Sequence, residues 1–398
     1  MVRSAETVIE TAPVAGAATK GDQLLRLIRA SQPVTRTDLA ERLGVDKSTV
    51  TEKIKPLVES GILLEESIEG GTHGRKRRVL SFADTGDYFV GINLGVRHTQ
   101  IGATSLNGHI VDESDFVTPE RAESALGIVR ERIAAISRSR QGRLPRVIGV
   151  SVPGMTDANR TGLLFAPNLS WRNVDIASPL ITANGTKVVV ENDATAAAMF
   201  EARVRIRDSE AGLMSNFILV RSGTGIGVGL VIGSEVYRGS GVGRGVAGEF
   251  GHMTIVAGGK KCVCGNRGCW EKYASAASAA SLYMGDRPPK GNETIPRFVE
   301  IVAKAENGEV RSKRTLEMIG EYLGIGFAKV ILGIGIPRVV FSGRLVYAWS
   351  FIEGPIREAI GRSIIGKVDG WSIEAGEPVG SAIGGALEVA VDEYLSTL

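Results

Sequence analysis

Apolar positions in the first eighty residues recur every three or four residues in three short segments, which predicts three helices. Pro33 closes the first helix, and the second begins after Thr35 and ends at Gly44. Asp46 is a candidate amino-terminal cap for the third helix, whose apolar residues keep the same period. A helix, a turn that contains glycine and a further helix form the pattern of a helix-turn-helix.

Two strands are predicted after these helices, at 62–67 and 77–82, with a glycine-rich connection between them. Four consecutive cations at this hairpin suit phosphates or a narrow minor groove: Arg75, Lys76, Arg77 and Arg78. The third helix carries polar side chains that can face base edges and phosphates: Lys47, Ser48, Thr49, Thr51 and Lys53. The alternative is a three-helix packing unit with a solvated basic loop. A basic wing directly after a helix-turn-helix favours binding of double-stranded DNA.

From residue 88 onward the pattern changes to short apolar strands separated by turns. Asn107-Gly108 is a strong hairpin signal and predicts that the first strands form a meander. A helix is expected near 122–139. Further strands are expected at 147–152, 187–190, 217–221 and 228–232. Because a glycine-rich turn between strands recurs in both halves, we expect two lobes of α/β structure.

All three cysteines lie within eight residues of one another, and one of the four histidines lies just upstream. The residues are His252, Cys262, Cys264 and Cys269, with the spacing His-x9-Cys-x-Cys-x4-Cys. Four nitrogen and sulfur ligands can close a tetrahedron around Zn²⁺, and no fifth protein ligand is evident, so we expect a structural zinc site. The alternative is three buried thiols beside an unrelated imidazole. Glu249 and Glu271 flank the motif, so the metal can fix two acids around a pocket.

Composition agrees with a globular protein of two or three packed units, because 43% of the 398 residues are hydrophobic and 23% are charged. The net charge of +3 is too small to indicate nucleic-acid binding by itself. No cysteine remains to form a disulfide, and no segment resembles a signal peptide or a membrane span, so a cytoplasmic location is expected and no membrane partner.

The residues after position 85 resemble the ROK family (repressors, open reading frames, kinases), which has the actin, sugar kinase and Hsp70 fold. The most specific mark is Glu249-Phe-Gly-His252 followed by the three-cysteine motif, and the sequences at 190–198, 222–227 and 167–171 also fit the family pattern. The amino-terminal winged helix resembles that of the repressor branch. The resemblance implies an α/β fold in which a winged helix-turn-helix precedes a two-lobed, actin-like ATPase fold.

The resemblance also implies a sugar site. In family kinases the aspartate that matches Asp193 is the general base for the accepting sugar hydroxyl. The positions that match Asn192, Glu249, His252 and Glu271 contact sugar hydroxyls, and Asn168 is a further candidate. Carboxylates, amides and imidazoles held on rigid turns supply the directional hydrogen bonds that a polyol needs. Asp193 has an alternative role as the cap of the alanine-rich helix that follows.

The phosphate side of the predicted cleft departs from the family pattern. Kinases of the family carry an Asp-x-Gly-Gly-Thr type of turn that holds Mg²⁺ and ATP, whereas this chain has Asn93-Leu-Gly-Val96-Arg97. Asn93 lacks the charge that attracts Mg²⁺, and Val96 adds a side chain where the backbone approaches phosphate. Arg344 stands where the family often has glycine, and it can obstruct an adenine or bind an anion. We therefore expect a sensor without catalytic residues rather than an enzyme.

Three functions remain as hypotheses. The first is a transcriptional repressor, a homodimer or tetramer that binds a palindromic DNA operator and responds to a sugar or sugar phosphate. The second is an active ATP-dependent sugar kinase with an added DNA-binding domain. The third is a constitutive DNA-binding protein that uses the sugar fold only to dimerise. The expected parts are a disordered tail at 1–18, a winged helix at 19–82, a small lobe at 83–194 completed by 375–398, and a large lobe at 195–374.

Overall fold

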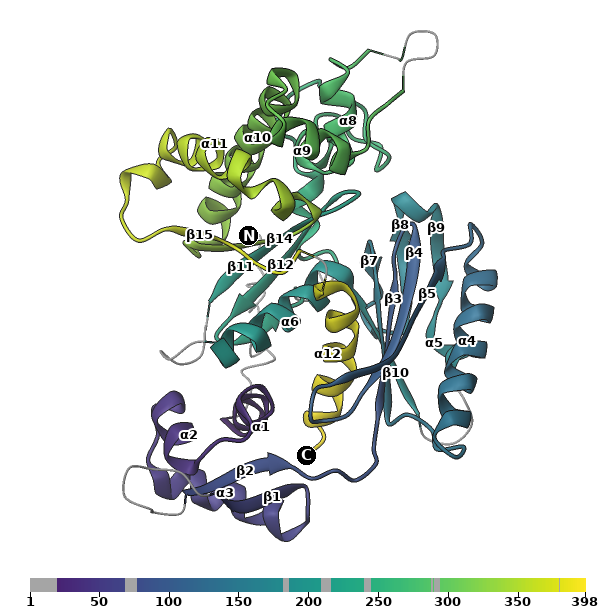
Figure 1. The fold of residues 1–398 in the computed structure, drawn as a ribbon, viewed down its shortest axis with the longest axis vertical. Coiled ribbons are helices and arrows are strands. Elements are labelled where there is room, and N and C mark those ends of the chain that lie inside the picture. The colour runs from purple at the N-terminus through teal and green to yellow at the C-terminus, as the bar shows by residue number, and fades with distance from the viewer. Residues whose placement is uncertain are drawn as a thin grey trace, which may run out of the picture.

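The computed structural model describes residues 20–68, 77–181, 186–208, 216–239, 245–287, 289, 294–378 and 380–398. Arg75 and Lys76 of the predicted basic wing, and the tail expected at 1–18, lie outside these residues. A helical amino-terminal unit lies below two sheets, each of which carries helices on its outer side (Figure 1). The α/β fold class expected from the sequence is confirmed.

The amino-terminal unit has the order of elements that its apolar pattern predicts. Its helices are α1 (Lys20–Ser31), α2 (Arg36–Leu43) and α3 (Lys47–Glu59), and its strands are β1 (Leu63–Ile68) and β2 (Arg77–Phe82). Thr35 forms a capping box with Asp38 at the start of α2, and Gly44 ends the helix at a φ of 60°. Asp46 precedes α3 as expected, but its side chain makes no capping hydrogen bond. The two strands pair in antiparallel fashion.

The first sheet has the strand order β10-β6-β3-β4-β5. Its strands are β3 (Phe89–Leu94), β4 (His98–Thr104), β5 (Ile110–Val117), β6 (Val147–Val152) and β10 (Lys187–Asn192). The predicted meander is present, because β3, β4 and β5 are consecutive antiparallel neighbours. Helix α4 (Ala122–Ser139) covers one face through a shared apolar core.

Helix α12 (Ser381–Leu395) packs on the other face of this sheet. A Cβ atom at Gly149 would lie 2.2 Å from the Ala386 carbonyl oxygen, and one at Gly91 would lie 2.6 Å from the Leu387 side chain. Glycine at these positions lets α12 approach the strands closely. The last helix of the chain is therefore packed against its first sheet.

The second sheet has the order β13-β12-β11-β14-β15. Its strands are β11 (Phe217–Ser222), β12 (Ile226–Ile232), β13 (Glu235–Tyr237), β14 (Arg338–Gly343) and β15 (Ser372–Ala375). The helices of this region are α7 (Glu271–Ala274), α8 (Ser278–Tyr283), α9 (Phe298–Glu306), α10 (Val310–Ile334) and α11 (Trp349–Gly361). They share one large apolar core with the sheet.

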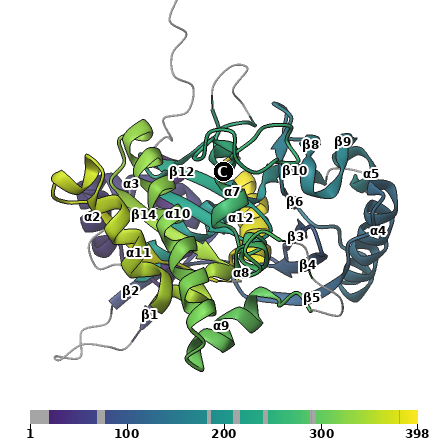
Figure 2. The same ribbon diagram turned by 90° about the horizontal axis from the view of Figure 1, so that it is seen from above.

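Helices α6 (Asp193–Asp208) and α12 lie between the two sheets (Figure 1), and Figure 2 shows α12 in this position from above. Helix α6 starts directly after β10 and contacts α1, α12 and the strands β11 and β12. A small third sheet joins β7 (Met155–Thr156), β8 (Gly162–Ala166) and β9 (Trp171–Asp175), with the short helix α5 (Ala177–Leu180) after it. No helix in the described part of the chain is long and apolar enough to cross a membrane.

Candidate functional site

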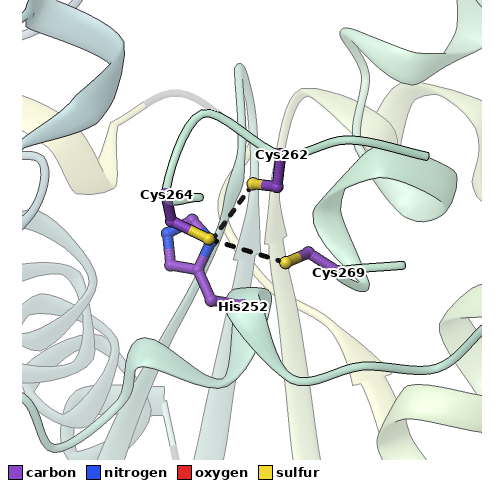
Figure 3. A group of neighbouring side chains, drawn as sticks. All are labelled: His252, Cys262, Cys264 and Cys269. Atoms are coloured by element: carbon purple, nitrogen blue, oxygen red, sulfur yellow. Dashed lines mark hydrogen bonds between the residues drawn. The ribbon is translucent and has the colours of Figure 1, made fainter. Parts of the chain in front are cut away.

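The metal ligands predicted from spacing lie together. One atom each from His252, Cys262, Cys264 and Cys269 lies within 4.8 Å of every other, and Figure 3 shows the four side chains pointing toward one another. His252 ends a short 3-10 helix (Glu249–His252), and Cys269 directly precedes the Trp270 that leads into α7. The cluster could hold a metal ion, as the sequence predicts.

The spacing of the ligand atoms suits a tetrahedral ion. The Cys264 and Cys269 sulfurs are 3.7 Å apart, and the Cys262 sulfur is 3.6 Å from His252 Nδ1. Sulfurs bound at the usual Zn–S length would be separated by roughly 3.8 Å at a tetrahedral angle. Burial raises the pKa of the Cys262 and Cys269 thiols. A bound cation is the ordinary means of holding such thiols as thiolates.

All of the sugar-contact candidates line one cavity of about 420 Å³, which is in the range of small-molecule sites. They are Asn168, Asn192, Asp193, Glu249, His252 and Glu271. The structure thus gathers residues from β10, α6, α7 and two 3-10 helices at one place. What each contributes to ligand binding stays a prediction.

Asn192, rather than Asp193, caps helix α6. Its side-chain oxygen accepts hydrogen bonds from the backbone N–H groups of Ala194 (2.9 Å) and Thr195 (3.1 Å). Its amide nitrogen donates to the Gly154 carbonyl at 3.0 Å and to Glu249 at 3.4 Å. The capping role considered for Asp193 is therefore wrong, because the helix begins at Asp193 itself, one residue earlier than that role requires, and the Asp193 carboxylate pairs with Arg221 instead.

The acids next to the metal cluster contact its ligands. Glu271 is buried and accepts a hydrogen bond from the Cys262 thiol at 3.1 Å, while Glu249 lies 3.7 Å from His252 Nε2. Burial, together with the negative charges of Asp193 and Glu271, raises the pKa of Glu249 to about 7. The imidazole of His252 thus faces Cys262 through Nδ1 and Glu249 through Nε2. A carboxylate beside the second nitrogen is a common means of orienting a histidine that binds a metal through the first.

Arg221 also lines the cavity, although the sequence did not single it out. Arg221 lies on strand β11, and its guanidinium donates a hydrogen bond of 2.9 Å to the Asp193 carboxylate. Burial raises the pKa of Asp193, and the charge of Arg221 offsets part of that rise. The available signal was a single charged residue directly after the apolar run Phe-Ile-Leu-Val.

The glycine turn between β11 and β12 is held closely against the acids. A Cβ atom at Gly225 would lie 2.5 Å from Glu271 Oε2, and one at Gly227 would lie 2.7 Å from the Ala194 methyl group. Gly223, in the same turn, has no atom within 4 Å of its Cβ position. Only part of this turn therefore requires glycine for packing.

Asn93, which also lines the cavity, is hydrogen-bonded inside the protein. Its amide nitrogen donates to Gln100 at 3.0 Å, and its oxygen accepts from the Ser151 hydroxyl at 3.1 Å. Arg97 and Arg344 also line the cavity, from the β3–β4 turn and from the residue after β14.

The predicted DNA contacts on α3 differ in exposure. Lys47, Ser48 and Thr51 are exposed, whereas Thr49 and Lys53 are half-buried. In the wing, Arg77 lies 3.7 Å from Asp38 and Arg78 lies 3.5 Å from Glu65, and both arginines are exposed. These residues share the amino-terminal unit, and their contact with DNA stays a prediction.

Known proteins resemble this chain in both its amino-terminal unit and the two lobes that follow. A sequence profile of the ROK family matches residues 89–387, and a profile of a helix-turn-helix domain matches residues 23–66. The xylose repressor of Bacillus subtilis (strain 168) is 29% identical over 351 residues, 87% of each chain. A glucokinase of Streptomyces coelicolor is 28% identical over 293 residues, which cover 70% of this chain and 88% of that protein.

Among solved structures, a ROK family transcriptional regulator, a homologue of the Escherichia coli MLC protein, superposes with a TM-score of 0.72. It is 22% identical, and the match covers 94% of this chain and 97% of the other. At this identity the likeness concerns the fold, which extends through the amino-terminal unit.

Proposed function

The chain belongs to the ROK family, and from this membership we propose that it is a sugar-responsive DNA-binding repressor of carbohydrate-utilisation genes. The observation that carries the proposal is the physical connection between the helix-turn-helix and the cavity. The relatives named as xylose repressors support the same function. In this account residues 19–82 read DNA, and the two lobes beyond them bind the sugar.

Helix α6 supplies the first connection. It begins at Asp193 in the cavity, and near its other end the Ile206 carbonyl accepts a hydrogen bond of 3.1 Å from Arg42 of α2. A helix of 16 residues is about 24 Å long. A ligand that moves Asp193 therefore acts on the same rigid element that contacts the helix-turn-helix.

Helix α1 supplies the second connection, because it contacts elements of both sheets. Arg26 pairs with Glu235 of β13 in the second sheet and with Asp392 of α12, at 2.5 Å, beside the first sheet. Apolar residues of α1, α6 and α12 also share a core: Leu24, Ile28, Met199, Val391 and Leu395 belong to it. A change in the angle between the lobes would separate the two acids that Arg26 holds.

Coupling of sugar to DNA needs only a difference in affinity between two lobe arrangements. A difference of about 1–3 kcal/mol changes affinity roughly 5- to 150-fold, and the effect is reciprocal between the two ligands. The His252 and cysteine cluster, as a structural zinc site, would hold Glu249 and Glu271 in the cavity. A symmetric homodimer or tetramer would place two helix-turn-helix units on a palindromic operator.

Selection from genomic DNA with the purified full chain tests this proposal. We expect enrichment of a palindromic site near sugar-utilisation genes, and release of that site when one sugar of a panel is added. Absence of any enriched site at moderate salt would refute the proposal.

A sugar kinase is the second candidate, because Asp193 lines the cavity beside the glycine turn and because a glucokinase is among the relatives. Two features weigh against it: Arg221 pairs with the acid that would serve as the base, and Asn93 offers Mg²⁺ no charge. An assay of ADP release over a panel of hexoses separates the candidates. Turnover that is lost in Asp193→Ala would establish the kinase.

A further inference from the structure

Two arginines from different parts of the chain face the same pair of acids beside helix α1. Arg26 of α1 pairs with Glu235 of β13 and with Asp392 of α12. Arg238 is the residue after β13, and it lines a second cavity, of about 60 Å³, together with Arg26 and both acids. Burial alone would lower the pKa of the Arg238 guanidinium, but nearby carboxylates raise it, and those of Asp392 and Glu235 are among them. Arg238 is therefore within electrostatic reach of the acids that hold the helix-turn-helix unit.

The hydrogen-bond partner of Arg238 is Glu191, the residue before the Asn192 and Asp193 that line the sugar cavity. Arg238 Nε donates to Glu191 Oε2 at 2.6 Å, and the Glu191 side chain is only 5% exposed. The other oxygen of Glu191 accepts a hydrogen bond of 3.2 Å from the backbone N–H of Asn192. The carboxylate that holds Arg238 is thus attached to the segment that a sugar in the cavity would touch.

The Glu191–Arg238 pair joins the two sheets. Glu191 belongs to β10 of the first sheet, whereas Arg238 follows β13 of the second. The same Glu191 oxygen also lies 3.3 Å from Arg160. Arg160 is fixed to the first sheet, because its carbonyl accepts a hydrogen bond of 2.8 Å from the Val190 N–H and its guanidinium pairs with Glu393 of α12 at 2.8 Å. A change in the angle between the lobes would therefore leave Glu191 with Arg160 and break its contact with Arg238.

We propose that Glu191 and Arg238 form a switch that couples the sugar cavity to helix α1. Glu191 holds Arg238 in the sugar-free protein, and a sugar that moves residues 192–193 releases it. The freed Arg238 then competes with Arg26 for Glu235 and Asp392, which loosens α1 from the two lobes. This inference rests on the proposed sugar-responsive function and names two positioning residues for it.

Such an exchange of partners keeps the buried charges compensated. Removing one partner of a buried ion pair is strongly destabilising, whereas passing two acids from one arginine to another leaves them paired. The displaced Arg26 can turn to solvent, because its side chain is already 23% exposed. The second cavity gives a guanidinium room to move, since a void of its size holds several water molecules. Ion pairs that change partners between two domain arrangements are a known basis of conformational switches.

Two variants with opposite expected effects test the switch. The full chain is titrated with its labelled DNA site, and the sugar is whichever of xylose, glucose and N-acetylglucosamine shifts the DNA affinity of the unchanged chain. Glu191→Gln weakens the hold on Arg238. Without sugar it should already have the DNA affinity that the unchanged chain has at saturating sugar, a shift of about fivefold or more. Arg238→Gln removes the competitor and should keep the sugar-free affinity even at saturating sugar.

Two further measurements separate the switch from a general loss of stability. The double variant should behave as Arg238→Gln does, because Glu191 acts through Arg238. Coupling between two ligands is reciprocal, so the calorimetric affinity for sugar should rise in Glu191→Gln and fall in Arg238→Gln. Glu353→Gln removes an exposed partner of Arg357 on α11, at 2.8 Å, and is the matched control that should respond as the unchanged chain does.

Hydrogen exchange of the amides in residues 20–31 measures the loosening of α1 without DNA. Sugar should accelerate this exchange in the unchanged chain. Exchange should be fast without sugar in Glu191→Gln and stay slow with sugar in Arg238→Gln. If Glu191→Gln does not fold, Arg238→Gln decides alone.

A sugar response of normal size in Arg238→Gln, or a shift of both single variants in the same direction, would overturn the inference and leave the repressor function standing. If no sugar of the panel changes the DNA affinity of the unchanged chain, the repressor function fails, and the switch fails with it.

Discussion

Arg29 of helix α1 and Glu388 of helix α12 form a buried ion pair between residues that are 359 positions apart in the chain. Arg203 of α6 contacts the other oxygen of Glu388 at 2.6 Å. Three helices therefore meet at one carboxylate: one from the helix-turn-helix unit, one that starts in the cavity, and one that packs on the first sheet. This junction lies on the route by which a sugar signal would reach DNA.

Replacement of Glu388 by glutamine should destabilise the protein by about 3 kcal/mol or more, because it leaves two arginines partly buried without their counter-charge. Urea unfolding monitored by circular dichroism measures the loss. Glu321→Gln removes an exposed partner of Arg362, at 2.7 Å, and should cost less than about 1 kcal/mol. Equal losses in the two variants would mean that the junction contributes no more than a surface pair.

Gly225→Ala should weaken sugar binding at least about tenfold, since the new methyl group would collide with Glu271, 2.5 Å away, and displace it. Gly223→Ala is the matched control, because its methyl group meets no atom within 4 Å. Isothermal titration with the effector sugar compares the two variants. Unchanged affinity in Gly225→Ala would show that Glu271 does not contact the sugar.

Cys264→Ser should lower the bound zinc and weaken the sugar response before it weakens binding to bare DNA. The reason is that the cluster contacts Glu249 and Glu271 and lies away from the helix-turn-helix. Atomic absorption, sugar titration and DNA titration give the three quantities. Lys261→Ala, an exposed change in the same loop, should alter none of them. Parallel loss of sugar and DNA binding would indicate global unfolding instead.

Lys47→Ala should weaken DNA binding similarly for all sequences and reduce the slope of log affinity against log salt by about 0.9, the value for one lost phosphate contact. Lys47 is exposed at the start of α3. Lys313→Ala, exposed on α10, removes the same charge far along the chain and should leave the slope unchanged. If both variants reduce the slope equally, α3 has no special role in DNA contact.

Local chemistry explains what the sequence predicted correctly. Gly44 ends α2 in the left-handed conformation that glycine favours, and α4 has the predicted bounds of Ala122–Ser139. The metal cluster also follows from spacing, because its four ligands lie within 18 residues of one another and short turns between them leave few alternatives. In each case the deciding interactions join residues that are close in the chain.

The remaining features depend on contacts between elements that are far apart in the chain. A single sequence does not show which of these elements lie side by side. The pairing of Arg221 with Asp193 requires β11 to lie beside the start of α6, and the Arg29–Glu388 pair requires the two ends of the chain to meet. Asp193 suits a helix cap as well as the adjacent Asn192 does, and its residue type does not show that the helix already begins at Asp193. The ROK resemblance supplied the fold that local patterns could not.

Titration of the enriched DNA site with the full chain, in the absence and presence of saturating effector sugar, tests the central claim most directly. Fluorescence anisotropy of the labelled site at fixed salt reports the dissociation constant in each case. The account predicts a shift of at least about fivefold with sugar alone and no added nucleotide. A dissociation constant that stays the same at saturating sugar, for a protein that binds both ligands, would contradict it.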